Sequence, residues 1–157
     1  MAILATLAVV VIISGLWGVS RIGSTSGSTT SEQSTNGKTA IVYKSPTCGC
    51  CGGYVSYLKR AGYDVEVKNE QDMASIKTRF GIPHDMSSCH TMIIDDYIVE
   101  GHVPMDAVEK LLTEKPSIDG IALPGMPSGS PGMPGPKRGL FTVYALNDSS
   151  SSEFTKL

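Results

Sequence analysis

The chain has 157 residues, a length close to that of one ordinary domain with an appendage. Its formal net charge is -2 at pH 7, and its 13 Lys and Arg residues are dispersed along the sequence. Because a protein that binds nucleic acid carries a basic patch or stripe, this charge pattern excludes nucleic acid as a partner.

The N-terminal stretch predicts a membrane segment. From Ala2 to Val19 every residue is apolar or small, and a helix over this stretch would span roughly 27 Å, enough to cross a bilayer. It lacks a basic leading segment and a clear A-x-A site. We therefore favour an uncleaved transmembrane anchor over residues 1–19, with the rest of the chain in the periplasm or outside the cell. A cleaved signal peptide, leaving a soluble periplasmic protein, is the alternative, and Arg21 alone would favour a cytoplasmic C-terminus.

Composition also sets the domain boundaries. Residues 20–37 are mostly Ser, Thr and Gly, which cannot bury enough apolar surface to fold, so we expect a flexible linker. We place a folded domain over residues 38–146 and a disordered tail over residues 147–157. Within the domain, residues 123–139 are rich in Pro and Gly and contain two P-G-M-P units, which predict an irregular surface loop.

The rest of the domain alternates between strand-like and helix-like patterns, as a small mixed α/β sheet flanked by helices requires. Strands are predicted where β-branched and aromatic residues run or alternate, at residues 39–44, 63–68, 91–95, 97–100 and 140–146. Helices are predicted where apolar residues recur at helical spacing, at residues 52–61, 73–80 and 105–115. Gly62 is suited to end the first helix and Pro104 to open the last. The final strand is expected at the edge of the sheet.

Cysteine crowding is the strongest chemical signal in the chain. Cys48, Cys50 and Cys51 lie in SPTCGCCGGY, while Cys89 lies alone in SSCHTMII. Cys48 and Cys51 form a C-x-x-C pair with a third thiol inside it. The cluster falls between the first predicted strand and the first predicted helix, where a helix N-terminus stabilises thiolates. Such crowding indicates a soft-metal site, a redox site, or both.

The predicted element order, with C-x-x-C at the first strand-to-helix turn, is that of the thioredoxin-like fold. In that fold the turn before the third strand packs against the C-x-x-C, which would bring Cys89 and His90 beside the other cysteines. Thioredoxins carry a cis-proline at this turn, whereas this chain has Ser88-Cys89-His90-Thr91. The difference makes general disulfide exchange less expected.

A closer resemblance extends from Ile41 to about Leu146. The run SPTCGCCGGY, SSCHT, EGHVP and LPGMPSGSPGM, in that order, is similar to the CopG-type family of copper-resistance-associated proteins. This is a thioredoxin-like family catalogued as having unknown function. The resemblance implies an exported copper-binding protein whose clustered cysteines hold Cu(I), with a redox role left open.

The chemistry of the thiols leaves several alternatives. Structural zinc sites usually come as two spaced pairs of ligands, a pattern that three crowded cysteines and one distant cysteine fit poorly. Cu(I) accepts two or three sulfurs and shares bridging thiolates, so we favour a polynuclear Cu(I) site with Cys48, Cys50, Cys51 and Cys89 as ligands. Thiol–disulfide chemistry by Cys48 and Cys51 is the alternative, and zinc or iron–sulfur stays open. A Cys48–Cys51 disulfide, leaving Cys50 and Cys89, competes as the metal-free resting state.

Four further side chains are candidates for the metal or its surroundings. His90 follows Cys89 directly, and in a strand its side chain should point away from Cys89. His102 in EGHVP is expected near the site, either as a ligand or supporting group or as a helix cap. Met126 and Met133 carry thioethers suited to Cu(I), although loop methionines also fill gaps.

Together these observations predict a membrane-tethered protein that sequesters or hands over Cu(I) for copper resistance or homeostasis. Its partners would be copper ions, the membrane through residues 2–19, and other copper-handling proteins. A copper or thiol oxidoreductase is the competing class. A passive interaction domain stapled by disulfides is a third class, which the cysteine spacing disfavours.

Overall fold

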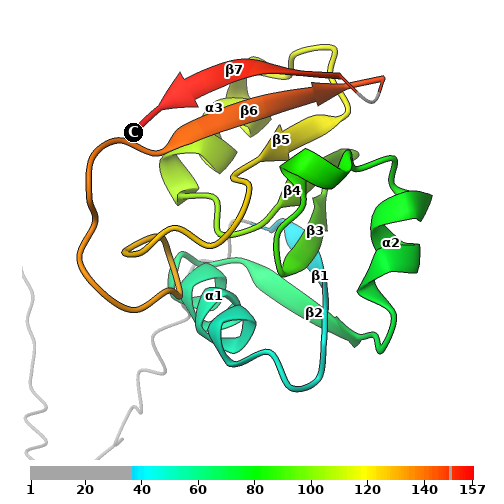
Figure 1. The fold of residues 1–157 in the computed structure, drawn as a ribbon, viewed down its shortest axis with the longest axis vertical. Helices are drawn as coiled ribbons and strands as arrows, with labels where there is room; N and C mark the ends of the chain where they lie inside the picture. Colours follow the sequence, from blue (N-terminus) through cyan, green and yellow to red (C-terminus); the bar gives the residue numbers. More distant parts are fainter. Residues whose placement is uncertain (1–36, 149) are drawn as a thin grey trace, which may run out of the picture. The chain divides into compact units, whose positions relative to one another are not determined.

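A computed structural model describes residues 37–148 and 150–157, in which a seven-stranded mixed sheet is combined with three α-helices (Figure 1). The strands are β1 (Thr39–Lys44), β2 (Asp64–Asn69), β3 (His90–Ile94), β4 (Tyr97–Glu100), β5 (Gly120–Ala122), β6 (Thr142–Asn147) and β7 (Ser150–Lys156). The helices are α1 (Gly49–Arg60), α2 (Met73–Arg79) and α3 (Met105–Glu114), with a short 3-10 turn η1 (His84–Met86). The predicted elements up to α3 are thus confirmed to within a few residues.

The strands are arranged in the order β2-β1-β3-β4-β5-β6-β7. The pairs β1–β2 and β4–β5 are parallel, and the other neighbouring pairs are antiparallel. Since β1 and β3 are antiparallel neighbours, the end of β1 lies beside the start of β3, with Lys44 opposite His90. The chain leaving β1 and the chain entering β3 therefore meet at the same end of these two neighbouring strands.

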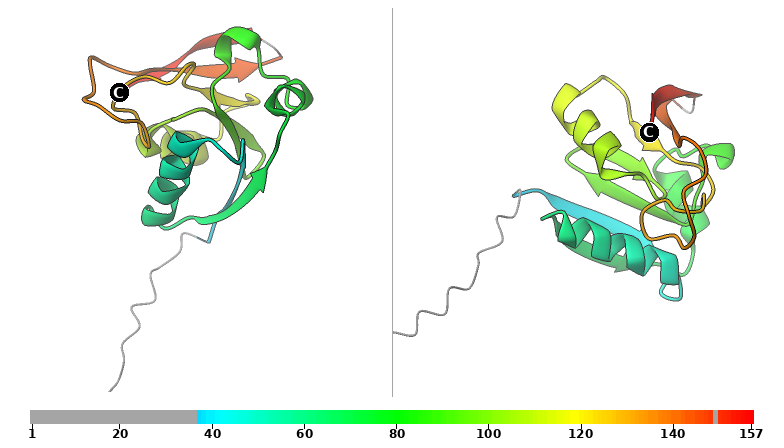
Figure 2. Two further views of the ribbon diagram at one scale, coloured as in Figure 1. Left: turned by 60° about the horizontal axis from the view of Figure 1, so that its bottom comes forward. Right: turned by 90° about the vertical axis from the view of Figure 1, so that its left-hand side faces the viewer.

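The two faces of the sheet carry separate apolar clusters. On one face, Tyr54 and Leu58 of α1 and Leu111 of α3 pack with buried strand residues such as Val42 and Met92. Figure 2 shows α1 running alongside β1 and β2. On the other face, a smaller cluster joins η1 and the residues before it to β5 and β6. This packing leaves the N-terminal turn of α1 at the end of the sheet where β1 stops.

Local chemistry explains where α1 begins and ends. Cys48 is its N-cap, and the Cys48 side chain accepts from the Cys51 backbone N–H. At the other end Gly62 has a φ of 88°, the left-handed conformation that glycine adopts without a Cβ clash, so the predicted helix stop is confirmed. Cys50 and Cys51 therefore lie in the first turn of a helix, as the sequence predicts.

The C-terminal segment corrects two expectations. Residues 147–157, expected to be a disordered tail, contain β7, which pairs with β6 along most of its length. Consequently β6 is an internal strand, not the edge strand we expected. The sequence did not predict this strand because its serines show no apolar alternation. Its pairing with β6 is made by backbone hydrogen bonds, and Phe154 adds contacts by packing against the core and lying under the Lys110 ammonium.

The short strand β5 was also not predicted. It has only three residues, too few to show a period. A Cβ at Gly120 would overlap the Ile98 carbonyl oxygen of β4, so glycine permits the close pairing of β5 with β4. This strand carries the chain from α3 into the Pro/Gly-rich loop.

The predicted anchor over residues 1–19, and residues 20–36 of the predicted linker, lie outside the described residues. Within the described part of the chain, no helix is both long and apolar enough to cross a membrane.

Candidate metal centre

The four cysteines meet at the end of the sheet where β1 stops and β3 begins. Cys48, Cys50 and Cys51 form the start of α1, and Cys89 directly precedes β3. Their four sulfur atoms lie within 4.8 Å of one another. The prediction that all four cysteines converge is therefore confirmed, and its cause is the antiparallel pairing of β1 with β3.

The sulfurs form a disulfide with two free thiols beside it. Cys48 and Cys51 are bonded, whereas Cys50 and Cys89 are free and half-buried. The Cys50 Sγ lies 3.5 Å from the Cys48 Sγ and 3.8 Å from the Cys89 Sγ. The disulfide is the metal-free pairing that the sequence left as a competitor. Cys50 thus links the disulfide to the distant cysteine.

Burial holds Cys89 in its protonated form. Burial, reinforced by the neighbouring Cys50, raises the pKa of Cys89 to about 12. At neutral pH this thiol therefore keeps its proton unless a cation displaces it. On the α1 side of the cluster, the first turn of the helix contains no acidic residue.

His102 is oriented toward Cys89 by a distant loop. Its Nδ1 lies 2.6 Å from the carbonyl oxygen of Pro131, and its Nε2 lies 2.9 Å from the Cys89 Sγ. A carbonyl can only accept, so Nδ1 carries the proton and the Nε2 lone pair faces the thiol. Burial lowers the pKa of His102, only partly offset by Pro131, so the ring is neutral. Both ring nitrogens of His102 are thus engaged away from α3, and the Met105 N–H at the start of α3 donates to the Tyr57 hydroxyl at 2.9 Å, so the capping role considered for His102 is wrong.

His90 corrects a sequence expectation. It was expected to point away from Cys89, yet its Nδ1 lies 3.5 Å from the Cys89 Sγ. Cys89 precedes β3, so strand alternation does not separate the two side chains. The ring is fully buried, and burial, together with His102, Lys77 and Lys44, lowers the pKa of His90 to about 3. Among the described residues its buried Nε2 has no hydrogen-bond partner.

Tyr54 is a site residue that sequence reasoning treated only as core. Its ring lies 4.5 Å from the His90 ring and 5.6 Å from the His102 ring, measured between centroids. The Tyr54 hydroxyl donates to the Val103 carbonyl at 2.9 Å. The helical spacing that makes Tyr54 a core residue gives no signal of its second role, which is to pack against both imidazoles.

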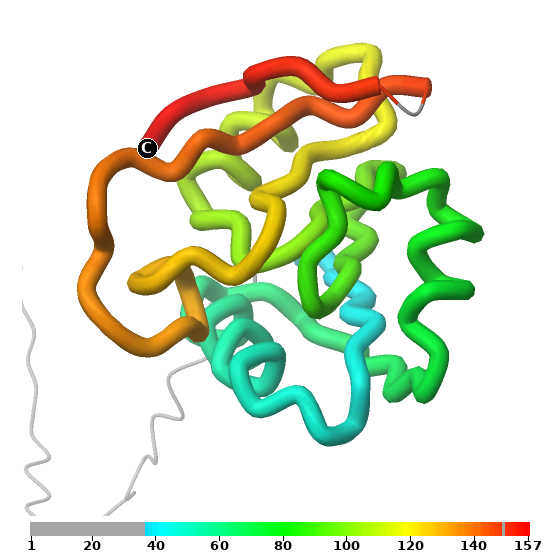
Figure 3. The backbone as a smooth tube through the Cα atoms, in the orientation of Figure 1, coloured from blue at the N-terminus to red at the C-terminus, as the bar shows by residue number. Residues whose placement is uncertain are grey.

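The Pro/Gly-rich loop between β5 and β6 packs against the cysteine-bearing turn. Figure 3 shows this loop, yellow to orange, descending toward α1. A Cβ at Gly132 would lie 2.5 Å from the Tyr54 backbone nitrogen and 2.8 Å from the Cys50 carbonyl oxygen. Of the two candidate methionines, Met133 follows this contact and is half-buried, whereas Met126 is 53% exposed. The loop thus covers one side of the cluster and is more than a free surface connection.

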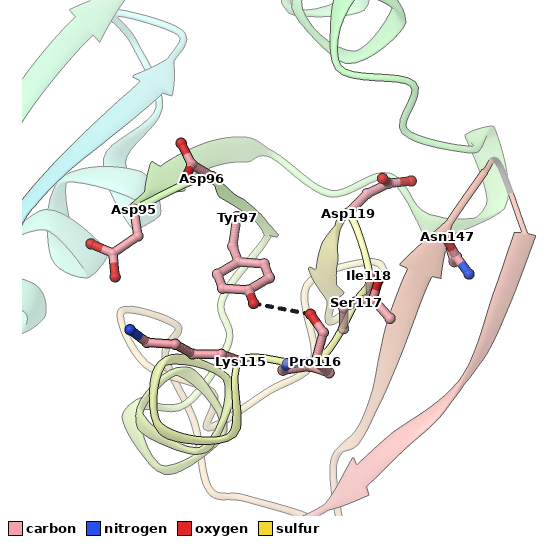
Figure 4. A pocket seen from close by; sticks show the side chains of 9 residues that line it. All are labelled: Asp95, Asp96, Tyr97, Lys115, Pro116, Ser117, Ile118, Asp119 and Asn147. Atoms are coloured by element: carbon pink, nitrogen blue, oxygen red, sulfur yellow. Dashed lines mark hydrogen bonds between the residues drawn. The ribbon is translucent and has the colours of Figure 1, made fainter.

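A surface cavity lies away from the four cysteines. It has a volume of about 660 Å³ and is lined by the acidic residues Asp95, Asp96 and Asp119, among others (Figure 4). In it the Tyr97 hydroxyl donates to the Pro116 carbonyl at 3.0 Å. Since Asp95 and Asp96 join the end of β3 to the start of β4, this cavity lies at the opposite end of these strands from Cys89.

One protein-family model matches the part of the chain that carries Cys89. The family model described as "Protein of unknown function, DUF411" matches residues 86–133. This range includes Cys89, both buried histidines and most of the loop. None of the curated proteins matches the chain.

Two solved structures match over most of their length. "Copper resistance protein copG- Form 2" is 38% identical and has a TM-score of 0.71, with 76% of this chain and 98% of that chain covered. "Copper resistance protein copG- Form 1" is 39% identical and has a TM-score of 0.69, with 76% and 96% covered. The chain therefore belongs to the DUF411 family, as a homologue of the copper resistance protein CopG.

Proposed function

We propose that this chain binds Cu(I) through Cys48, Cys50, Cys51 and Cys89 and serves copper resistance or homeostasis. The observation that carries the proposal is the convergence of four sulfurs within 4.8 Å. Thiolates are preferred ligands of soft Cu(I), and one sulfur can bridge two ions, so this crowding suits a polynuclear site. Both homologous structures are of a copper resistance protein, which supports copper as the metal.

Binding through all four sulfurs depends on the redox state of the protein. In the described form only Cys50 and Cys89 are free thiols. Reducing the Cys48–Cys51 disulfide takes two electrons and two protons and yields the other two thiols. Each thiol then gives up its proton when it binds Cu(I).

The histidines support the sulfur cluster. With its proton held at Nδ1 by Pro131, His102 offers its Nε2 lone pair to the Cys89 thiol. The Nδ1 of His90 lies 3.5 Å from the same sulfur. Both rings are neutral, the form in which imidazole binds a metal. We assign His90 and His102 to the border of the cluster, as terminal ligands or hydrogen-bond partners of Cys89.

We further infer that residues 39–114 form a thioredoxin-like unit. Support comes from the element order β1-α1-β2-α2-β3-β4-α3, from the strand order β2-β1-β3-β4, and from the C-x-x-C at the start of α1. β5, β6 and β7 extend this unit and position the covering loop.

A second candidate function is thiol–disulfide exchange by Cys48 and Cys51. The disulfide at the N-terminus of α1 favours it, because this is where a helix stabilises a leaving thiolate. Copper redox chemistry at the same sulfurs is the other oxidoreductase version. A reductase assay on disulfide substrates, with a C48S/C51S variant as control, distinguishes thiol exchange from copper binding.

We also propose that residues 1–19 tether the domain to a membrane, with the domain in the periplasm or outside the cell. The apolar stretch from Ala2 to Val19 supports this proposal. Membrane fractionation of the full chain against a chain lacking residues 1–37 tests it. Equal partitioning of both chains into the soluble fraction would contradict the tether.

The experiment that tests the main proposal is anaerobic reconstitution with Cu(I), Cu(II) or Zn(II), followed by metal counting per chain. We expect several Cu(I) ions per reduced chain and weaker retention of the other two metals. Selective retention of one Zn(II) per chain would contradict the Cu(I) proposal and indicate a structural zinc site.

A further inference from the structure

A buried carboxylate lies directly behind the Cys89 turn. Glu100, the last residue of β4, has a fully buried side chain, and its partner Lys77 of α2 is 14% exposed. The two form an ion pair through the Glu100 Oε1 atom. Burying two charges costs free energy that a surface pair does not, so the pair calls for a reason beyond stability.

The carboxylate also binds both ends of the segment that carries Cys89. Its Oε1 accepts from the Ser88 backbone N–H at 2.6 Å, and its Oε2 accepts from the Thr91 hydroxyl at 2.6 Å. Ser88 and Thr91 are the residues on either side of the Cys89–His90 pair. Glu100 thus fixes the backbone before the cysteine and after the histidine.

The same strand end connects Glu100 to His102. The residue between them, Gly101, donates its backbone N–H to the His90 carbonyl at 3.0 Å. Glu100 therefore lies where the Cys89 segment and the His102 segment are joined. The Cys89 Sγ lies 3.8 Å from the Cys50 Sγ and 2.9 Å from the His102 Nε2. A shift of the Glu100 carboxylate would move Cys89 relative to both.

Packing alone does not account for this choice of residues. Replacing a buried ion pair with apolar residues of similar size is often neutral or stabilising in proteins. A carboxylate, in contrast to an apolar side chain, can accept from three donors at once, here Lys77, Ser88 and Thr91. What Glu100 adds over an apolar residue is the fixed position of the segment from Ser88 to Thr91.

We propose that Glu100, paired with Lys77, is a positioning residue of the metal centre. It fixes the backbone of Cys89 so that this sulfur stays within reach of the other three, and it does not itself touch the metal. The expected effect on Cu(I) affinity rests on the proposed function, whereas the position of Cys89 can be tested in the metal-free protein as well.

The test replaces the ion pair with apolar residues in a K77M/E100L variant. The matched control is K110M/E114L, which makes the same substitutions in the exposed Lys110–Glu114 pair on α3. We expect K77M/E100L to stay folded but to bind Cu(I) about 10–100-fold more weakly, the usual effect of losing a group that orients a metal ligand. The control should bind as wild type does. Affinity is measured by competition with a chromophoric Cu(I) chelator.

A metal-free measurement separates this inference from the proposed function. In the protein with its Cys48–Cys51 disulfide, Cys50 and Cys89 are the free thiols. Diamide removes two electrons and two protons from them to form a Cys50–Cys89 disulfide and is itself reduced to the hydrazine. We expect K77M/E100L to slow this cross-linking about tenfold, as followed by peptide mass spectrometry. This result would support the positioning role even if wild type bound no Cu(I).

Two milder variants keep the test decisive if K77M/E100L fails to fold. E100Q retains an oxygen that accepts from Ser88, so cross-linking and Cu(I) affinity should stay within about threefold of wild type. T91V removes one contact to the carboxylate and should slow cross-linking more than E100Q does. The inference is overturned if folded K77M/E100L shows wild-type cross-linking and wild-type Cu(I) affinity. If K77M/E100L is unfolded, the same two results in T91V overturn it.

Discussion

Replacing Gly132 with alanine tests whether the Pro/Gly-rich loop is held against the cysteine-bearing turn. The new Cβ would lie 2.5 Å from the Tyr54 nitrogen and 2.8 Å from the Cys50 oxygen, both backbone atoms of α1 that cannot swing away. Gly132 also has a φ of 82°, which disfavours any residue with a Cβ. The loop must therefore move, and with it the Pro131 carbonyl that orients His102.

The magnitude has two parts that a control separates. Positive φ costs alanine about 1–2 kcal/mol, and the overlap with α1 adds about 1–3 kcal/mol. Gly125 has a φ of 69°, but a Cβ there would meet nothing within 4 Å. G125A should therefore lose only the first part, whereas G132A should lose about 2–5 kcal/mol in total.

Urea unfolding of the metal-free protein measures this difference, and Cu(I) competition measures the effect on the site. We expect G132A to be less stable than G125A and to bind Cu(I) more weakly, because His102 loses its orientation. Equal stability and equal Cu(I) affinity in the two variants would show that the loop does not support the centre.

Three further predictions concern the thiols and the histidines. Protein with its Cys48–Cys51 disulfide intact should bind fewer Cu(I) ions than reduced protein, since two of the four sulfurs cannot ionise; equal counts in metal analysis would contradict this. The pKa of His90 is lowered to about 3, so the unfolded chain takes up a proton near pH 6.5 that the folded chain refuses. The free energy of unfolding should therefore fall as the pH drops from about 6.5 toward 3, and an H90N variant should flatten this dependence while H84N, at an exposed position, should not. H102A should keep nearly the wild-type Cu(I) count but release copper faster, because a group at the border of the cluster controls release more than stoichiometry; loss of half the copper would make His102 an essential ligand.

The sequence predicted the cysteine cluster because its parts follow from local patterns. The strand before Cys48 and the strand after Cys89 are both readable, and their antiparallel pairing brings the two turns together. His90 was predicted in the wrong direction because the rule of alternation applies only inside a strand, and Cys89 lies just outside β3.

Other features of the site depend on long-range contacts that leave no local signal. The Pro131 carbonyl meets His102 across 29 positions of sequence, and only the folded loop shows which nitrogen carries the proton. Glu100 looks like the end of an ordinary strand until Ser88 and Lys77 are placed around it. The tail was mispredicted for a related reason, since β7 shows no apolar alternation and is recognised as a strand only by its pairing with β6.

Counting Cu(I) ions per chain under reducing conditions, in wild type and in C48S, C50S, C51S and C89S, tests the central claim most directly. Bridging thiolates are shared between ions, so the loss of any one sulfur should lower the number of bound Cu(I) ions as well as the affinity. Lower counts in all four variants are the predicted result. If every variant still bound the wild-type number of Cu(I) ions, the four-cysteine cluster would not be the copper site, and the loop carrying Met126 and Met133 would become the leading candidate.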